Sequence, residues 1–293
     1  MATDGVGRGS GIDVVIVAFN NQATIATTIA TLAQHLPGCA LYLVDHAATP
    51  STADVARQAA DEAGVAAVIE GDASNPGFGA GCNRMAAKGR NPWLLFLNPD
   101  ANVRSWPWAE TGNIPAGAVI GANLIGTDGQ EQHHYGRAWT TLSEIERGWL
   151  RRRPQLPDGH GFVSGAALLI ERRVFDSIGG FDTGYFLFYE DIDLCFRAAR
   201  AGARVRVEPG WRVEHLLGHS TRTDWTSALL VSLRSGRRFH ARWDSRTRPY
   251  DLFMAVDGAL RAAVHLALRH PDRARAHIAV TRAAARALLG RTT

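Results

Sequence analysis

The chain has 293 residues, of which 46% are hydrophobic and 20% are charged. These values are ordinary for a globular protein and exclude the disordered and fibrous classes. The length suits one large α/β domain with a helical appendage, or two small domains.

Charge is unevenly distributed. From Arg234 to the end there are thirteen arginines against four aspartates and no glutamate, a net balance of +9, whereas the preceding residues carry −5. Such a basic segment is typical of a chain that faces an anionic partner, or of a solvated helix face.

The cysteines and the apolar runs indicate the compartment. Cys39, Cys82 and Cys195 are odd in number and lack metal-ligand or redox spacing, which predicts buried free thiols in a reducing cytosol. Residues 1–11 are polar and Gly-rich, without the basic and apolar regions of a secretory signal. The apolar runs are too short to span a bilayer. We therefore expect a cytoplasmic protein, either soluble or peripheral at the inner face of the cell membrane.

Strands and helices alternate over the first hundred residues. Apolar, β-branched runs predict strands, and apolar residues at helical spacing between turn formers predict helices. The expected strands are 13–19, 41–44, 65–69 and 93–97, and the expected helices are 25–36, 52–64 and 77–87. This alternation predicts a mostly parallel, Rossmann-like sheet flanked by helices.

The middle of the chain is less regular, and its last part is helical. Expected strands there are 119–125, 130–135, 162–171, 203–207 and 211–213, and an acidic helix is expected over 190–201. Residues 141–153 suit a short helix or a flap. After Asp224 the pattern is wholly helical, with Pro249 and Pro271 as breaks. The domain boundaries that follow are a flexible N-terminus (1–11), an α/β domain (12–222) and a basic helical extension (223–293).

Polar residues end three of the predicted strands. Asn20, Asp45 and Asp100 each follow an apolar run. Ligands of parallel sheets sit beyond the carboxyl ends of the strands, so this coincidence is the first indication of a site.

The Gly-rich stretch from Asn75 to Asn83 superficially suggests a dinucleotide fingerprint. That fingerprint belongs directly after the first strand, where its glycines let a pyrophosphate reach a helix N-terminus. Here the stretch follows the third expected strand, which argues against a nicotinamide-binding domain. The alternatives are a ligand loop or a tight loop that packs a helix on the sheet.

Carboxylates and histidines supply the candidate chemistry. Asp100 can hold the Mg²⁺ or Mn²⁺ that a departing diphosphate needs, although an aspartate at a strand end is also a common turn former. Glu190 and Asp191 begin a helix after an aromatic run, where they either cap the helix or act as acid or base. Asp193 and Arg197, four residues apart, are expected to pair, which leaves Asp191, or else Glu190, for chemistry. Histidines 215 and 219 are structural or metal-ligating.

Seven short motifs then carry a family resemblance. They are Val15-Ile-Val-Ala-Phe-Asn20, Leu43-Val-Asp45, Asn75-x-Gly-Phe-Gly-Ala-Gly-x-Asn83, Leu95-Phe-Leu-Asn-Pro-Asp100, Gly180-Phe-Asp182, Phe188-Tyr-Glu-Asp-Ile-Asp193, and His215 with His219-Ser220. In order and spacing they resemble the inverting family 2 glycosyltransferases of the GT-A fold, and among them the bacterial rhamnosyltransferase-like enzymes of cell-wall and polysaccharide assembly. The resemblance covers residues 12–222.

This resemblance implies a role for each matching residue. The nucleotide-sugar pocket would be lined by Phe19, Asn20, Asp45, Asn75, Gly77, Phe78, Asn83, Asn98 and Asp100, with Asp45 reading the pyrimidine ring. Asp100 and His215 would hold the divalent metal, and Asp191 would be the catalytic base. Asp182, Tyr185 and Glu190 would lie on the acceptor side. The implied reaction is a single in-line displacement that inverts the anomeric carbon.

The chain also departs from the family pattern. His46 and Ala48 replace a usual Asn and Ser, Cys82 replaces a frequent Asn, and Phe19 replaces a frequent Tyr. These departures concern which nucleobase and which sugar the donor carries. They do not fall on the implied metal ligands or on the implied catalytic base. The favoured donor is dTDP-L-rhamnose, with UDP-galactofuranose or UDP-N-acetylglucosamine as alternatives, and the acceptor is a hydroxyl of a glycan or polyprenyl-linked sugar.

Two other classes of function compete with this interpretation. A non-catalytic, nucleotide-sugar-binding scaffold protein would share the fold, and a retaining glycosidase would use two clustered carboxylates but leave Asp45 and Asp100 idle. No nucleic-acid partner is expected.

In the basic extension, Val256, Leu260, Val264 and Leu268 form an apolar stripe near Arg261 and Arg269. The stripe either lies on anionic lipid or packs on the catalytic domain or on the second copy of a homodimer.

Overall fold

The computed structural model describes residues 11–47, 51–109, 112–132, 135–137, 161–216, 225–244 and 247–290. The expected helix or flap at 141–153 and the motif residues His219 and Ser220 lie outside these ranges.

The first hundred residues fold as the sequence predicts. The elements are β1 (Ile12–Ala18), α1 (Ile25–His35), β2 (Ala40–Asp45), α2 (Thr52–Ala63), β3 (Ala66–Gly71), α3 (Phe78–Ala86) and β4 (Trp93–Leu97). The ends of α2 show the expected signals. The Ser51 hydroxyl accepts a hydrogen bond from the Ala53 N–H, and Gly64 ends the helix in the left-handed conformation.

The middle elements were predicted less well. They are β5 (Ala101–Val103), β6 (Ala118–Ile125), β7 (Tyr135–Arg137), β8 (Gly161–Val163), β9 (Ala167–Glu171), α5 (Arg172–Ser177), α6 (Glu190–Arg200) and β10 (Arg204–His215). The single strand expected at 162–171 is two strands, because β8 pairs with β7 in a small sheet while β9 joins the main one. Of the strand expected at 130–135, the described residues 130–132 carry only an isolated bridge between Ile125 and Glu131, and Tyr135 begins β7. The two strands expected at 203–213 are one, β10, with an irregularity between Glu208 and Arg212.

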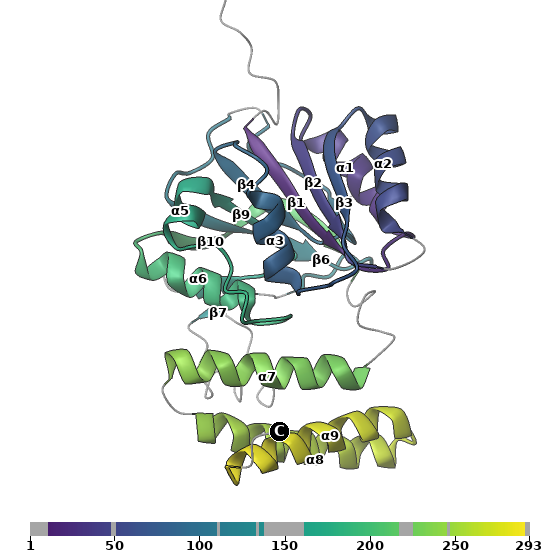
Figure 1. The fold of residues 1–293 in the computed structure, drawn as a ribbon, viewed down its shortest axis with the longest axis vertical. Coiled ribbons are helices and arrows are strands. Elements are labelled where there is room, and N and C mark those ends of the chain that lie inside the picture. Colours follow the sequence, from purple (N-terminus) through teal and green to yellow (C-terminus); the bar gives the residue numbers. More distant parts are fainter. Residues whose placement is uncertain are drawn as a thin grey trace, which may run out of the picture.

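The main sheet has eight strands in the order β3-β2-β1-β4-β9-β6-β10-β5 (Figure 1). Pairs among β1 to β4, and the pair of β6 with β10, are parallel. Strand β9 runs antiparallel to both β4 and β6, and β5 runs antiparallel to β10. The expected mostly parallel sheet is therefore found in the first half of the chain, and the second half makes it a mixed sheet.

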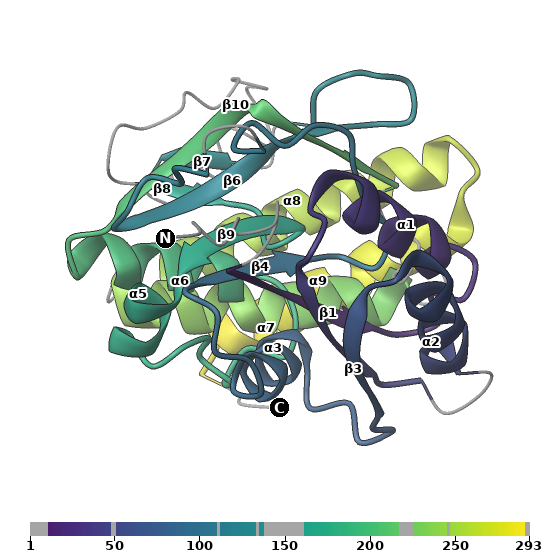
Figure 2. The same ribbon diagram turned by 90° about the horizontal axis from the view of Figure 1, so that it is seen from above.

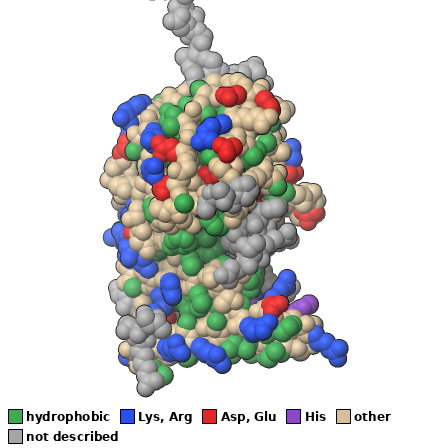
Figure 3. All heavy atoms as spheres, turned by 45° about the vertical axis from the view of Figure 1, so that its right-hand side comes forward, with side chains coloured by type: hydrophobic (Ala, Val, Ile, Leu, Met, Phe, Trp, Pro, Cys, Tyr) green, Lys and Arg blue, Asp and Glu red, His purple; other side chains and the backbone are tan. Residues whose placement is uncertain are grey.

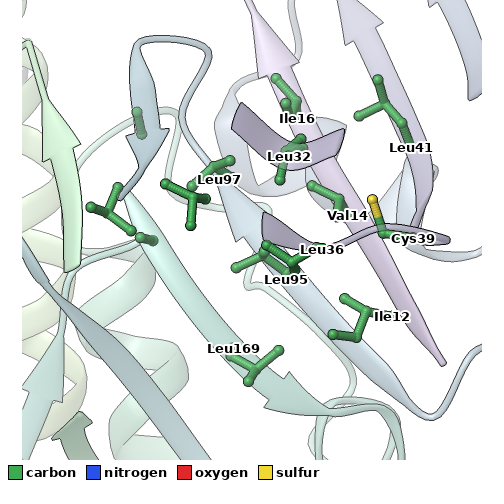
Figure 4. Packing of buried hydrophobic residues seen from close by; sticks show 14 of the residues in the cluster. Ile12, Val14, Ile16, Leu32, Leu36, Cys39, Leu41, Leu95, Leu97 and Leu169 are labelled. Atoms are coloured by element: carbon green, nitrogen blue, oxygen red, sulfur yellow. The ribbon is translucent and has the colours of Figure 1, made fainter. Parts of the chain in front are cut away.

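Helices cover both faces of the sheet (Figure 2). Alternate residues of β1 point to opposite faces, so Val14 and Ile16 pack with Leu32 of α1 and with Leu36, just after α1, on one side (Figure 4). Val15 belongs to the other cluster, which includes residues of α3, α5 and α6. Cys39, Cys82 and Cys195 are buried free thiols, as the sequence predicts.

Three long helices follow the sheet. They are α7 (Trp225–Trp243), α8 (Thr247–Ala267) and α9 (Pro271–Leu288), and they stack beyond α6 with α7 nearest to it (Figure 1). Phe239 of α7 is completely buried against Tyr189 and Phe196. Pro249 lies in the first turn of α8 rather than between helices, where its missing N–H breaks no helical hydrogen bond. No helix in the described ranges is long and apolar enough to cross a bilayer.

Candidate active site

The sheet brings the predicted strand-end residues to one edge. The parallel register sets Ala18 of β1 opposite Asp45 of β2, and β4 runs parallel to β1 on its other side. The antiparallel strand β9 starts at this same edge, where Ala167 faces Leu97. The Asn98 N–H donates to the Ala166 carbonyl at 2.9 Å. The carboxyl ends of β1, β2 and β4 therefore meet the beginning of β9.

Asp100 and His215 lie side by side at this edge. Strand β5, which follows Asp100, pairs with the end of β10 and sets Ala101 opposite His215. The His215 Nε2 lies 3.5 Å from the Asp100 Oδ1 and 3.2 Å from the Asn98 Nδ2. Both side chains are nearly buried, and the His215 Nδ1 has no hydrogen-bond partner among the residues that the structure describes. The Gln132 side chain donates to the His215 carbonyl at 2.8 Å and so fixes the strand end.

These two side chains fit the donor set of a divalent cation. A carboxylate oxygen and an imidazole nitrogen converge, and Mg²⁺ usually takes only one or two protein ligands, with substrate phosphates and water completing its shell. Within the described ranges no group of three or more His, Cys, Asp and Glu side chains forms a metal cage. The arrangement therefore suits a cation that arrives with a diphosphate.

Asp191 connects to the same edge through one residue. The Gly165 N–H donates to the Asp191 Oδ2 at 2.8 Å, and Gly165 precedes Ala166, which binds Asn98. A side chain at Gly165 would meet both Asp191 and the Phe78 ring, so the carboxylate and this ring lie close together. Asp191 is half-buried at the first turn of α6, whose dipole favours a negative charge.

Glu190 and Asp191 have different surroundings. Burial raises the pKa of Glu190 well above its ordinary value, and the neighbouring charge of Asp191 raises it further. Burial also raises the pKa of Asp191, but hydrogen bonds from the N–H groups of Gly165 and Ile192 oppose this effect. Within the described part of the chain, the Glu190 Oε2 has no hydrogen-bond partner. Of the two carboxyl groups, Asp191 therefore ionises before Glu190 as the pH rises.

The turn before these carboxylates is strained. Phe188 and Tyr189 both have φ of +68°, which is uncommon for bulky residues and costs about 1–3 kcal/mol each. The C-terminal helices hold this turn in place. The Ser235 hydroxyl of α7 donates to the Leu187 carbonyl at 2.8 Å, and the Tyr189 hydroxyl lies 3.4 Å from that of Tyr250 in α8.

The Gly-rich stretch forms a tight loop into α3 beside this turn. Gly77 has φ of +102°, and a side chain there would come within 2.5 Å of the Phe186 carbonyl, which accepts the Phe78 N–H. Asn75 also has positive φ. Asn83 uses both ends of its amide to bind the backbone of Phe181. In this structure Asn83 joins α3 to the loop after α5, and the contact of Asn75, Gly77, Phe78 and Asn83 with a nucleotide sugar stays a prediction.

Asp45 is completely buried in the structure. Its carboxylate accepts hydrogen bonds from the N–H groups of Ala47 and Ala53 at 3.0 Å and from the Ser51 hydroxyl at 3.3 Å. It therefore organises the loop into α2, and its reading of a pyrimidine base stays a prediction. Phe19 and Asn20, at the end of β1, are exposed, and Asn20 has φ of +59°.

Asp182 and Tyr185, two of the residues predicted on the acceptor side, have different surroundings. Asp182 pairs with Arg238 at 3.0 Å and Arg242 at 2.8 Å, both from α7. Burial alone would raise the pKa of Asp182, but the Gly184 N–H and Arg238 hold that pKa below its ordinary value. Tyr185 is completely buried beneath Arg238, and burial raises the pKa of its hydroxyl. Tyr185 is thus a core residue, because the arginines of α7 cover it.

Sequence reasoning missed the groups that hold the site residues. Gly165 was placed inside a continuous strand, although its small size and the neighbouring Ser164 were a signal for a break. The roles of Gln132, Ser235 and Tyr250 had no local signal, because they depend on segments far apart in the chain. The pairing of Asp193 with Arg197 is confirmed, at 2.7 Å.

Comparisons with known proteins agree with this architecture. A 131-residue stretch is 35% identical to the N-acetylglucosaminyl-diphospho-decaprenol L-rhamnosyltransferase of Mycobacterium tuberculosis (strain H37Rv), spanning 45% of this chain and 41% of that protein. Over 81 residues, 28% of this chain and 31% of the relative, it is 37% identical to rhamnosyltransferase WbbL of Escherichia coli K12. The chain thus spans less than half the length of these relatives.

Solved structures share the fold. The chain superposes on the mannosyltransferase PcManGT of Pyrobaculum calidifontis, solved with GDP-Man and Mn²⁺, with a TM-score of 0.54 and 16% identity, covering 94% of this chain and 75% of that one. TarS 1–349 from S. aureus gives a TM-score of 0.52 at 12% identity, over 94% and 91% of the two chains. The predicted GT-A-type fold is thereby confirmed. The model of the family "Glycosyltransferase like family 2" matches residues 10–238, and the chain belongs to this family.

Proposed function

We propose that this protein is an inverting glycosyltransferase that moves a sugar from a nucleoside diphosphate to a hydroxyl acceptor. One observation supports this proposal above the others. The Asp100–His215 pair and the Asp191 carboxylate lie at the same edge of the sheet, joined through Asn98, Ala166 and Gly165. The proposed cation ligands and the proposed base for the acceptor would therefore act within one site.

In this mechanism Asp191 removes the acceptor proton. The N–H groups of Gly165 and Ile192 fix its carboxylate, so one orientation of the base is maintained during the displacement. Asp100 and His215 would hold a divalent cation, Mg²⁺ or Mn²⁺, which when bound neutralises charge on the departing diphosphate. Phe78, next to Asp191, and the exposed Phe19 supply apolar walls for the sugar and the nucleobase of the donor.

The names of the relatives favour one donor and one class of acceptor. Two of them are rhamnosyltransferases by name, and one name specifies a diphospho-decaprenol substrate. The donor we propose is therefore dTDP-L-rhamnose, with UDP-galactofuranose or UDP-N-acetylglucosamine as alternatives, and the acceptor is a hydroxyl of a glycan or of a polyprenyl-linked sugar.

A thermal-shift panel tests the donor site. We expect dTDP or UDP to raise the melting temperature only with Mn²⁺ present, because a ligand that binds the folded state stabilises it. Asp100→Asn should abolish the Mn²⁺-dependent part, whereas Asp61→Asn, at an exposed position near the C-terminal end of α2, should keep it. Absence of a shift with every nucleotide would contradict the proposal. Nucleotide binding without transfer to any acceptor would favour a scaffold protein.

A further inference from the structure

The outer face of α8 is an exposed row of apolar side chains. Nine residues between 252 and 267 are exposed, and eight of them are apolar: Leu252, Val256, Ala259, Leu260, Ala263, Val264, Leu266 and Ala267. The ninth, Arg261, lies at the margin and pairs with Asp257 at 2.7 Å. The larger side chains are 41% to 57% exposed. At 1.5 Å per residue this outer row of α8 is about 22 Å long.

The opposite face of α8 packs on the rest of the chain. Tyr250 is completely buried and reaches Tyr189, and Gly258 lies against Thr281 of α9. Ala262 is buried on this same inner face. The alternative that the apolar stripe packs on the catalytic domain is therefore wrong, because the domain and α9 occupy the other side of the helix. Monomeric soluble proteins rarely expose contiguous apolar rows of this extent, and such rows usually mark a surface that binds a partner or a membrane.

Positive charge surrounds the outer row of α8. Arg248 is exposed just before it, and Arg269 and Arg273 are exposed just after it. Among the described residues none of these three forms an ion pair, in contrast to Arg237 and Arg261. Figure 3 shows arginine side chains beside hydrophobic ones at the end of the molecule formed by the C-terminal helices.

This charge distribution favours a membrane over a second copy of the chain. In a twofold dimer built on the outer row, the same positive surface would face itself, and like charges would oppose association. Anionic headgroups would instead neutralise the arginines while the acyl boundary takes up the apolar side chains.

We propose that α8 lies in the plane of an anionic membrane with its outer row in the interface. The inner face of the same helix contacts Tyr189, the residue before Glu190 and Asp191, so docking would hold the carboxylate site above the bilayer surface. Membrane binding stands without the proposed function. Only its purpose, access to an acceptor anchored in lipid, rests on that function.

Flotation of the full-length protein with vesicles tests this proposal. We expect binding to vesicles of phosphatidylcholine with phosphatidylglycerol, and much weaker binding to phosphatidylcholine alone. Val256→Glu with Leu260→Glu should reduce the vesicle-bound fraction at least tenfold. Val68→Glu is the matched control, since Val68 on β3 is 42% exposed and Val256 is 41% exposed. Arg248→Ala and Arg269→Ala should each weaken binding to the anionic vesicles about fivefold.

Three results would overturn the proposal. They are no flotation of the unmodified protein, equal flotation of the Val256→Glu/Leu260→Glu variant, or a dimer in solution that this variant dissociates, which would assign the outer row to a second copy. Melting temperatures verify that the variants fold. Transfer to a water-soluble acceptor is measured in parallel. Vesicle binding without transfer would contradict the proposed function but would still support the proposal that α8 binds a membrane.

Discussion

Asp191 and Glu190 carry the same chemical group, and their environments separate them. Two N–H groups stabilise the Asp191 carboxylate, whereas one oxygen of Glu190 is buried and finds no hydrogen-bond partner in the described ranges. A carboxylate that is held in place and ionises first is suited to act as a base. Burial and the charge of Asp191 both oppose a second negative charge at the start of α6, and they raise the pKa of Glu190.

Asp191→Asn should reduce transfer about 10²–10⁴-fold, because the general base is lost while its shape remains. Donor binding, measured by the nucleotide-dependent thermal shift, should persist. Asp176→Asn, in an exposed position of α5, serves as the control and should leave the rate unchanged. Transfer at the original rate in Asp191→Asn would exclude this residue as the base.

Glu190→Gln should change how stability depends on pH. Because the folded-state pKa of Glu190 lies above its ordinary value of 4.5, the folded protein binds more protons than the unfolded chain between the two pKa values. The free energy of unfolding therefore falls as pH rises through this window. Gln cannot ionise, so the variant should lose this part of the fall and gain relative stability at neutral pH. Denaturant unfolding at several pH values measures it, and parallel curves for both proteins would contradict the assignment.

At the scale of elements, the site depends on short segments whose backbones are locally unfavourable. The loop at Gly77 touches the carbonyl of Phe186, and the turn at Phe188 and Tyr189 is left-handed. Neither conformation would persist in isolation, and each is held by an element from elsewhere in the chain.

Gly77→Ala should disturb the nucleotide site and destabilise the protein. The new Cβ would overlap the Phe186 carbonyl at a φ of +102°, so the loop and α3 must shift. Gly129→Ala is a matched control, since Gly129 also has positive φ, +76°, but nothing lies within 4 Å of its would-be Cβ. We expect Gly129→Ala to cost about 1 kcal/mol from backbone strain alone and to keep nucleotide binding. If both variants bind nucleotide equally, Gly77 is not needed for the loop.

For the molecule as a whole, the family match ends at residue 238, within α7, but the packing continues beyond it. Arg238 and Arg242 bind Asp182, Trp243 donates to Asp193, and Tyr250 reaches Tyr189. The predicted boundary near residue 222 therefore divides the sequence by charge and periodicity, while contacts join the two sides of it.

Phe239→Ala should destabilise the whole protein and not only the C-terminal helices. The ring is completely buried among Tyr189, Phe196 and Trp243, and its loss should cost about 3–5 kcal/mol. We expect one cooperative transition at a lower temperature, and lower transfer activity, because the turn before Asp191 loses support. Trp225→Ala, nearly half exposed at the start of α7, is the control. Separate melting of the helices and the sheet would contradict this view.

The sequence by itself determined the elements whose signals are local. Apolar β-branched runs and helical spacing gave β1 to β4 and α1 to α3, and the acidic start of α6 was also recognised. The parallel pairing of the first strands follows from their alternation with helices, so the joint position of Asn20, Asp45 and Asp100 at one sheet edge could be predicted too.

Only the tertiary structure decided how the site is held together. The antiparallel insertion of β9, which brings Gly165 to Asp191, has no local signature, because a pairing partner distant in the chain determines the direction of a strand. Likewise, the burial of Tyr185, the engagement of Asp182 by α7 and the exposure of the outer row of α8 depend on which faces meet in the folded chain. Helical periodicity identifies an apolar face, whereas long-range packing determines what covers it.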